Sequence, residues 1–448
     1  MSYIPNTGAD RKKMLAAVGV DNIDDLFQTI PEPLRFEREL EIPGRMDQIA
    51  LSRHAADLAK MNIGAGDMIC FLGAGIYDHY VPPTVGAVLG RSEFYTAYTP
   101  YQPEVSQGVL QSIFEFQSLI CQLTGMEAAN ASMYDGATAL AESSIMAREI
   151  TGRKKVLLAG HVNPAYKRVI DTYTHHIGIA VETIAPVNGV IDLAAAQSAL
   201  DSDTAALIAQ QPDFFGIVND MPALSRIAHK NNSLFISSFD PISLGILAPP
   251  GEYDADIAVA EGQSLGCPMG FGGPLLGLFA CKNEFLRRMP GRIVGQTKDI
   301  DGKTAYVMTL RTREQDIRRE RATSNICTNE ALYALAAAVY LSTTGKQGLR
   351  GIAELCLQKS HYAAKSISAL PGFELVYKDA PFFKEFVVKT PAPVNKINER
   401  LLDAGIIGGY PLDGAGERML VCVTEQRTKD DIDRLVAALK SAVQSPLL

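Results

Sequence analysis

The sequence lacks several features that would place it in a specialised class of protein. None of its 448 residues lies in an apolar run approaching the roughly 18 residues of a membrane-spanning helix. Its seven cysteines are odd in number and form no CxxC pair, so a disulfide framework and a zinc ribbon are both disfavoured. The seven histidines show no HxH or HExxH spacing, and we therefore expect no metal site.

An excess of basic charge is also missing. The net charge is −8, and nearby acids balance the short basic clusters at 11–13 and 318–321, which argues against nucleic acid as a partner. The first residues, MSYIPNTGAD, resemble neither a secretory signal nor a transit peptide. Together with the cysteine pattern, this predicts a soluble cytoplasmic protein with no membrane partner.

The order of apolar segments predicts three domains. Residues 1–85 contain short amphipathic helical patterns separated by Pro and Gly, and we expect an arm that is too small for its own core and wraps a neighbour. Residues 86–330 begin with a helix between Ser106 and Gly125 and then alternate buried-strand patterns with helices, which is typical of a mostly parallel α/β sheet covered on both faces. Residues 331–448 predict two long helices followed by a small α+β domain.

Three motifs fall where an α/β fold binds a ligand. The residues GAT at 136–138 begin a predicted helix, and their small side chains let backbone N–H groups approach an anion. Asp240 ends the strand pattern LFISSF, where it could pair with a protonated ring nitrogen. The loop AEGQSLGCPMGFGGP at 260–274 has the glycines of a cofactor loop but carries Gln263 where such a loop usually has a lysine. Each motif also has a purely structural interpretation, because small residues pack closely at helix starts and Asp-Pro often ends a strand.

Together, the glycine-led helix, Asp240 and the 260–274 loop resemble the large domain of fold-type I pyridoxal-phosphate-dependent transferases. Three longer segments closely resemble the glycine cleavage system P-protein family, glycine dehydrogenase (decarboxylating), and in particular its N-terminal half: YTAYTPYQPEVSQG (95–108), AANASMYDGATALAE (128–142) and RTREQDIRRERATSNICTNEAL (311–332). Some members of that family are one long chain of two homologous halves, whereas others are two separate subunits. This chain is similar to the first of those subunits.

The resemblance implies an oxidoreductase activity in glycine catabolism: glycine is decarboxylated as its pyridoxal-phosphate imine, and the aminomethyl group passes to the lipoyl arm of H-protein. In the second half or subunit, the cofactor lysine lies opposite Gln263, and an amide nitrogen is neither nucleophilic nor basic. We therefore expect no catalytic residue in this chain, and we expect a lysine-bearing subunit 2 to bind pyridoxal 5'-phosphate covalently. The other expected partners are lipoylated H-protein and glycine, in a heterotetramer with two copies of each subunit. Four residues would form a vestigial pocket, hereafter the cup: Gly136, Thr138, Asp240 and Gln263.

Fold-type I active sites lie at dimer interfaces, so the resemblance implies that this chain forms the wall facing its partner's lysine. The candidate residues lie in two polar stretches and could bind an amino acid or the cofactor phosphate: Tyr98, Tyr101, Gln102, Arg313 or Arg318, Thr323, Ser324 and Asn325. Alternatively, these residues only hold the subunit interface. Two other functions also stay open: a non-catalytic scaffold or regulatory paralogue, and a different fold-type I enzyme with an unusual lysine position, against which Gln263 counts.

Overall fold

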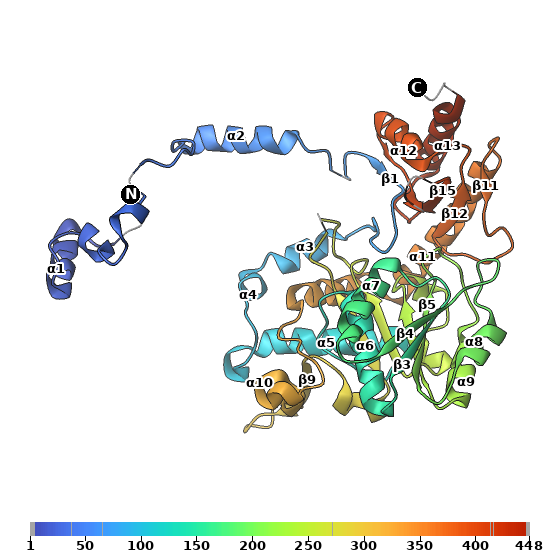
Figure 1. Cartoon of the computed structure of the whole chain (residues 1–448), viewed down its shortest axis with the longest axis horizontal. Helices are drawn as coiled ribbons and strands as arrows, with labels where there is room; N and C mark the ends of the chain where they lie inside the picture. Colours follow the sequence, from blue (N-terminus) through green and yellow to red (C-terminus); the bar gives the residue numbers. More distant parts are fainter. Residues whose placement is uncertain are drawn as a thin grey trace. The chain divides into compact units, whose positions relative to one another are not determined.

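The computed structural model describes residues 5–36, 38–64, 66–270, 272–412, 414 and 416–444 (Figure 1). Its contacts divide the chain into two units, Met1–Ile63 and Gly64–Leu448. The first unit contains α1 (Gly8–Val18), η1 (Asp24–Phe27), η2 (Glu32–Leu34) and α2 (Gln48–Lys60), where η denotes a 3-10 helix. Of the short amphipathic helical patterns predicted in residues 1–85, the stretch DNIDDLFQTI forms only the short 3-10 helix η1. None of the described side chains between residues 5 and 63 is buried, so this unit has no core of its own.

The second unit is built on a central sheet. Within the described residues this sheet has seven strands in the order β2-β8-β7-β6-β5-β3-β4. Strands β3 to β7 are parallel, whereas β8 is antiparallel to both β7 and β2, which confirms the predicted mostly parallel sheet. The bounds of the strands are β2 (Ala128–Ala129), β3 (Lys155–Ala159), β4 (Ala180–Ile184), β5 (Thr204–Gln211), β6 (Leu234–Phe239), β7 (Ile257–Glu261) and β8 (Gly277–Cys281).

Helices cover both faces of this sheet because alternate residues of each strand point to opposite sides. In β3, Val156 and Leu158 belong to one apolar cluster with the helix α6, while Leu157 and Ala159 belong to another with α8 and α9. Figure 1 shows α6 and α7 together and α8 beside α9. The helices are α5 (Gln107–Thr124), α6 (Gly136–Thr151), α7 (Pro164–His175), α8 (Leu193–Ala199) and α9 (Met221–Lys230). The helix predicted between Ser106 and Gly125 is confirmed, with Gly125 left-handed at φ 68° as its C-cap.

The carboxyl ends of three parallel strands lie level with one another. Gln211 in β5 pairs with Phe239 in β6, and Phe239 pairs with Ala260 in β7. Asp240, which follows β6, and Glu261, the last residue of β7, therefore lie at the same edge of the sheet, where ligands of open α/β sheets bind.

The rest of the second unit contains a long helix and a smaller sheet. Helix α11 (Ala331–Ser368) is interrupted at Gly345, whose φ of 60° is not helical, so the two predicted helices meet there. Among the described residues the smaller sheet has the order β11-β12-β15-β14, and its neighbouring strands are all antiparallel. Its strands and the helices that follow them are β11 (Glu374–Leu375), β12 (Glu385–Lys389), α12 (Val394–Asp403), β14 (Tyr410–Leu412), β15 (Arg418–Cys422) and α13 (Lys429–Gln444).

Several short elements connect these parts. Strand β1 (Ile69–Cys70) pairs with β13 (Ile406–Ile407), and β9 (Ile293–Lys298) forms a hairpin with β10 (Thr304–Thr309). The connecting helices are α3 (Pro83–Leu89), α4 (Ser92–Tyr95), η3 (Pro103–Val105), η4 (Ser243–Gly245), η5 (Pro250–Tyr253), η6 (Asn283–Arg288), η7 (Arg311–Arg313), α10 (Gln315–Arg318) and η8 (Arg319–Arg321). None of the helices in the described part of the chain is long and apolar enough to cross a membrane. The domain boundaries predicted after residues 85 and 330 stay a prediction.

Candidate functional site

The cup lies at the sheet edge where β6 and β7 end and α6 begins. Asp240 follows β6, Gln263 lies two residues after β7, and Gly136 is the first residue of α6. Thr138 belongs to the cap of that helix: its N–H donates to Asp135 Oδ1 at 2.7 Å, and its hydroxyl donates to the same carboxylate at 2.9 Å. The fold therefore gathers all four predicted residues at one edge, and it adds side chains from distant parts of the chain.

Gln263 is 2% exposed, and its side-chain amide is fully hydrogen-bonded. Its Oε1 accepts from the Tyr77 N–H at 2.9 Å, and its Nε2 donates to the Tyr77 carbonyl at 3.0 Å. The same Nε2 donates to the Cys267 carbonyl at 2.7 Å. The amide thus fixes the main chain of Tyr77 on both sides, a task that a lysine ammonium could not perform because it has no acceptor.

Glu261 occupies the N-terminus of α6. Its Oε2 accepts from the Gly136 N–H at 2.9 Å, and its Oε1 accepts from the N–H groups of Gln263 at 2.9 Å and Leu276 at 3.0 Å. Burial raises the pKa of Glu261 to about 7, although these three N–H donors act in the opposite direction. A Cβ added to Gly136 would lie 2.7 Å from the Glu261 nitrogen and 2.8 Å from the Tyr166 hydroxyl, so only glycine fits there.

Asp240 is paired with a lysine that the sequence did not single out. Lys384 is 2% exposed, and its Nζ forms an ion pair with Asp240 Oδ2. The ammonium also lies 3.4 Å from the centre of the Tyr77 ring. Burial acts to lower the pKa of Lys384, but the Asp240 carboxylate and other nearby groups together raise it. The Lys384 ammonium therefore stays charged at neutral pH.

Glu385, the residue after Lys384, attaches the segment 74–77 to the strand β12. Its Oε1 accepts from the Ala74 N–H at 2.7 Å, and its Oε2 accepts from the Tyr77 hydroxyl at 2.8 Å. Burial raises the pKa of Glu385 to about 7. The Tyr77 side chain and main chain are thus held by Glu385 and Gln263 respectively.

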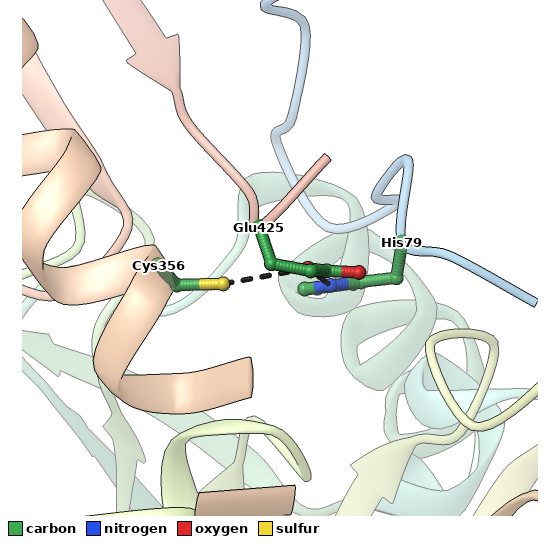
Figure 2. A group of neighbouring side chains, drawn as sticks. All are labelled: His79, Cys356 and Glu425. Carbon is green, nitrogen blue, oxygen red and sulfur yellow. Dashed lines mark hydrogen bonds and ion pairs between the residues drawn. The ribbon is translucent and has the colours of Figure 1, made fainter. Parts of the chain in front are cut away.

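A second cluster extends this network to α11. Figure 2 shows His79, Cys356 and Glu425 pointing toward one another. His79 Nδ1 lies 2.6 Å from Glu425 Oε2, and the Cys356 thiol donates to the same oxygen at 3.6 Å. Burial acts to raise the pKa of Glu425, but the hydrogen bond and charge of His79 lower it to about 2.

These three residue types can bind metal ions, and their ligand atoms lie within 4.8 Å of one another. However, the other nitrogen of His79, Nε2, lies 3.1 Å from Lys384 Nζ, and Glu425 Oε1 accepts from the Tyr80 N–H at 2.7 Å. A metal ion between the three side chains would have to replace the hydrogen bonds that His79 Nδ1 and the Cys356 thiol make with Glu425 Oε2, close to a buried ammonium. We therefore assign the cluster to the ion-pair network of the cup.

The first polar stretch, 95–107, packs beside the start of α11. Tyr98 is 85% exposed and borders a cavity of about 240 Å³ that Tyr95, Thr328 and Asn329 also line. Gln102 is exposed on the same stretch. The Tyr101 hydroxyl, in contrast, is engaged: it accepts from Arg292 Nη2 at 2.9 Å.

Arg292 was not predicted, yet it joins the two polar stretches. It is 6% exposed, and its guanidinium contacts Tyr101 from the first stretch and the Cys327 carbonyl and Thr328 hydroxyl from the second. Its position between PG and IVG gives no local signal, because its partners lie 35 or more residues away in the sequence.

The second stretch lines a larger cavity of about 750 Å³, in which Arg318, Thr323 and Asn325 lie with Arg288 and Glu142. The Ser324 hydroxyl is buried and donates to Glu142 Oε1 at 2.8 Å. Burial raises the pKa of Glu142 to about 7.

Arg313 faces inward, away from this cavity. Its guanidinium donates to the main-chain carbonyls of Leu310, Gly291 and Met289. The structure thus brings Arg318, Thr323 and Asn325 to one cavity and Tyr98 to another, whereas the partly buried Arg313 binds main-chain carbonyls.

The sheet, the glycine-led helix and the acid at the carboxyl edge define the class of protein: the fold is that of fold-type I pyridoxal-phosphate enzymes, as predicted. Two solved structures share it at low sequence identity. A sphingosine-1-phosphate lyase from Burkholderia pseudomallei is 16% identical with a TM-score of 0.67, and the match covers 93% of this chain and 95% of that one. An alanine–glyoxylate aminotransferase from Nostoc sp. is 19% identical with a TM-score of 0.60, covering 85% and 96%.

Closer matches extend over almost the whole chain. The family model described as Glycine cleavage system P-protein matches residues 1–439. A probable glycine dehydrogenase (decarboxylating) subunit 1 from Desulforamulus reducens is 53% identical over 444 residues, which are 98% of this chain and 99% of the relative. The protein of the same name from Moorella thermoacetica is 50% identical with the same coverage. A crystal structure of glycine decarboxylase (P-protein) of the glycine cleavage system, in inhibitor-bound form, is 40% identical with a TM-score of 0.90 and covers 99% of this chain and 100% of that one. The chain belongs to the glycine cleavage system P-protein family.

Pyridoxal phosphate, the cofactor of the fold class, does not fit among the described side chains of the cup. The cavity that Asp240 lines with Tyr77, Glu261 and Lys384 measures about 30 Å³, whereas small-molecule sites typically measure roughly 300–1,000 Å³. Glu261 already takes the N–H of Gly136, and Lys384 already takes the carboxylate of Asp240. Among the described residues at this edge, the Gly136 N–H and the Asp240 carboxylate are therefore already engaged, and position 263 carries an amide in place of an amine.

Proposed function

We propose that this chain is the lysine-lacking subunit 1 of a heteromeric glycine dehydrogenase (decarboxylating). With a lysine-bearing subunit 2 it decarboxylates glycine and transfers the aminomethyl group to the lipoyl arm of H-protein, in a complex with two copies of each subunit. Membership of the P-protein family and the relatives named as subunit 1 support the proposal. We also propose that the protein is cytoplasmic, as predicted from the cysteine pattern.

The position and the hydrogen bonds of Gln263 are the main support for placing the cofactor on the partner subunit. The residue stands where the family's cofactor loop is expected to carry lysine, and all of its amide's bonds within the cup go to the main chain of Tyr77 and Cys267. An amide cannot form an imine with the cofactor. In this proposal the partner subunit holds pyridoxal phosphate covalently, and the cofactor supplies an electron sink for the electron pair left by departing carbon dioxide.

This chain's part in the reaction is to bind and orient. Tyr98 and Gln102 are exposed on one stretch, and Arg318, Thr323 and Asn325 line the cavity beside the other. Hydroxyl, amide and guanidinium groups match the carboxylate of an amino acid or a phosphate. We propose that these side chains complete the pocket above the partner's lysine and exclude water from it.

We propose an indirect role for three further residues, Tyr101, Arg313 and Ser324. Their polar groups are engaged by Arg292, by main-chain carbonyls and by Glu142 respectively. We propose that they hold the two stretches in place, which keeps them in the site as positioning residues.

The proposal is tested by purifying this chain together with the lysine-bearing chain. After borohydride reduction, the cofactor should be found on a peptide of the partner, and exchange of labelled carbon dioxide into glycine in the presence of H-protein should require both chains. Cofactor fixed to a peptide of this chain would contradict the proposed division. Exchange that is equally fast without this chain would instead favour the scaffold or regulatory alternative.

A further inference from the structure

We propose that the cup of this chain is permanently closed by its own side chains, which replace an anionic cofactor group by group and clamp the C-terminal sheet onto the central sheet. This proposal rests on the proposed function and extends it. It adds a second reason why the cup holds no cofactor: the missing lysine is one, and the side chains that fill the cup are the other. It concerns this chain alone and is tested without partner subunit or H-protein.

The anion position is filled first. The start of a helix carries unpaired N–H groups and a partial positive charge, which makes it an anion site in many phosphate-binding proteins. In this chain Glu261 is the anion: its two oxygens accept three main-chain N–H groups, including that of Gly136 at the start of α6. An external phosphate at this helix start would have to displace the buried Glu261 carboxyl group from the Gly136 N–H.

The cation position is filled by Lys384. An acid after β6 is placed to pair with a protonated ring nitrogen, and in this chain Asp240 pairs with the Lys384 ammonium instead. The ring of Tyr77 lies against that ammonium at 3.4 Å. Carboxylate, cation and aromatic ring are thus all supplied from within the chain.

These groups come from three separate parts of the sequence. Asp240, Glu261 and Gln263 belong to the edge of the central sheet, Tyr77 and His79 to the segment after β1, and Lys384 and Glu425 to the C-terminal region. In the closed cup the side chain of Lys384 is 2% exposed and that of Asp240 is 10% exposed. Opening the cup would separate these two charged groups and bring both into contact with water. Because removing one member of a buried pair leaves an uncompensated charge, we expect this contact to hold the two sheets together.

Restoring the amine alone should therefore not restore the site. We expect the purified Gln263→Lys chain, incubated with pyridoxal phosphate and reduced with borohydride, to carry no cofactor on the peptide that contains position 263. Stoichiometric labelling of that peptide would overturn the proposal, because it would show that the cup opens once the amine is present.

Freeing the helix start should create an anion site. We expect inorganic phosphate to raise the unfolding temperature of Glu261→Ala but to leave wild type and the exposed-residue control Glu252→Ala unchanged. A rise in wild type equal to that in Glu261→Ala, or no rise in Glu261→Ala, would overturn the assignment of Glu261 as the internal anion.

The clamp is tested separately, so that a poorly folded Glu261 variant does not decide the matter. Lys384→Met and Asp240→Asn should each lower the unfolding temperature, and the double variant should recover a substantial part of the summed loss. Lys389→Met, on an exposed position of the same strand, serves as the control. Losses that simply add in the double variant would overturn the clamp.

Discussion

At the scale of single residues, this chain uses titratable and aromatic side chains in two ways. Those in the cup form hydrogen bonds or ion pairs with other groups of the chain. Several in the two polar stretches have polar atoms with no partner among the described residues, or with a partner for only one of two atoms. Tyr98 is the clearest free group, because it is 85% exposed and its hydroxyl forms no hydrogen bond with the described residues. Glu142 is the clearest half-free group, since only one of its two oxygens has a hydrogen-bond partner among the described residues.

The hydroxyl of Tyr98 is expected to matter only in the assembled enzyme. Tyr98→Phe should lower kcat/KM for glycine about tenfold, or about 1.4 kcal/mol, because one hydrogen bond to a charged group is lost. The unfolding temperature of the chain should not change. Steady-state assays of the complex and thermal unfolding provide the measurements, with Tyr410→Phe as the control. Unchanged kinetics would remove Tyr98 from the proposed pocket.

Glu142 should make stability depend on pH. Its pKa is raised from 4.5 to about 7 by burial, so the native state binds a proton that the unfolded state has already released. The resulting stabilisation is complete below the unfolded pKa and is lost as pH rises through about 7, and it amounts to about 3 kcal/mol at roughly 1.4 kcal/mol per pKa unit.

The Glu142→Gln variant removes this titration while keeping an acceptor for Ser324. The unfolding free energy of the variant should therefore increase relative to that of wild type as pH rises from about 5 to about 8. Denaturant unfolding at several pH values measures the difference, with the exposed Glu252→Gln as the control. A constant difference across that range would show that Glu142 is not protonated in the native state.

At the scale of elements, the start of α6 depends on the absence of a side chain. Gly136 lets the helix approach β7 closely enough for its N–H to reach Glu261. Gly351 in α11 provides the contrast, because it has open space where a Cβ would be.

These two glycines should respond oppositely to alanine. Gly136→Ala should cost about 1–3 kcal/mol of unfolding free energy, because its Cβ would lie 2.7 Å from a main-chain nitrogen. Gly351→Ala should stabilise the chain by about 0.5–1 kcal/mol, since alanine is the better helix former. Denaturant unfolding of both variants tests the pair, and equal effects would show that close packing at α6 is not needed.

At the scale of the whole molecule, the first unit is the part that is incomplete on its own. Large apolar side chains in it are exposed, among them Leu34 at 75%, Phe36 at 57%, Ile49 at 67% and Met61 at 80%. Exposed apolar groups in such number usually mark a surface that another chain covers. We expect the lysine-bearing subunit to cover them, in line with the arm predicted from the sequence.

Limited proteolysis measures this directly. In the isolated chain, cleavage should occur first before residue 64, and addition of the lysine-bearing subunit should slow it at least tenfold, because a covered segment must dissociate before it is cut. The turn at 299–303, where Ile300 is fully exposed, provides an internal reference for general protease activity. Equal cleavage with and without the partner would mean that these residues bury their apolar groups elsewhere.

Most elements of the second unit could be predicted because their signals are local. The strands β3 to β7, the helix between Ser106 and Gly125, and the placement of Asp240 and Gly136 all follow from apolar periodicity and short motifs. The filling of the cup could not be predicted in the same way. Gln263 meets Tyr77 across 186 residues, and Tyr77 meets Glu385 across 308, and in sequence KEFVVK looks like an ordinary strand with two charges at its start. Only the fold shows that those two charged residues are buried, at 2% and 3% exposure.

The closed cup also determines what the absorbance of bound cofactor would measure in the assembled complex. A complex in which both kinds of subunit were open would take up one cofactor per chain, and its colour would report total protein. With Glu261 and Lys384 filling the cup of this chain, the colour would report the partner alone. The ratio of cofactor absorbance to total protein would then become a direct gauge of how many lysine-bearing subunits each assembly contains.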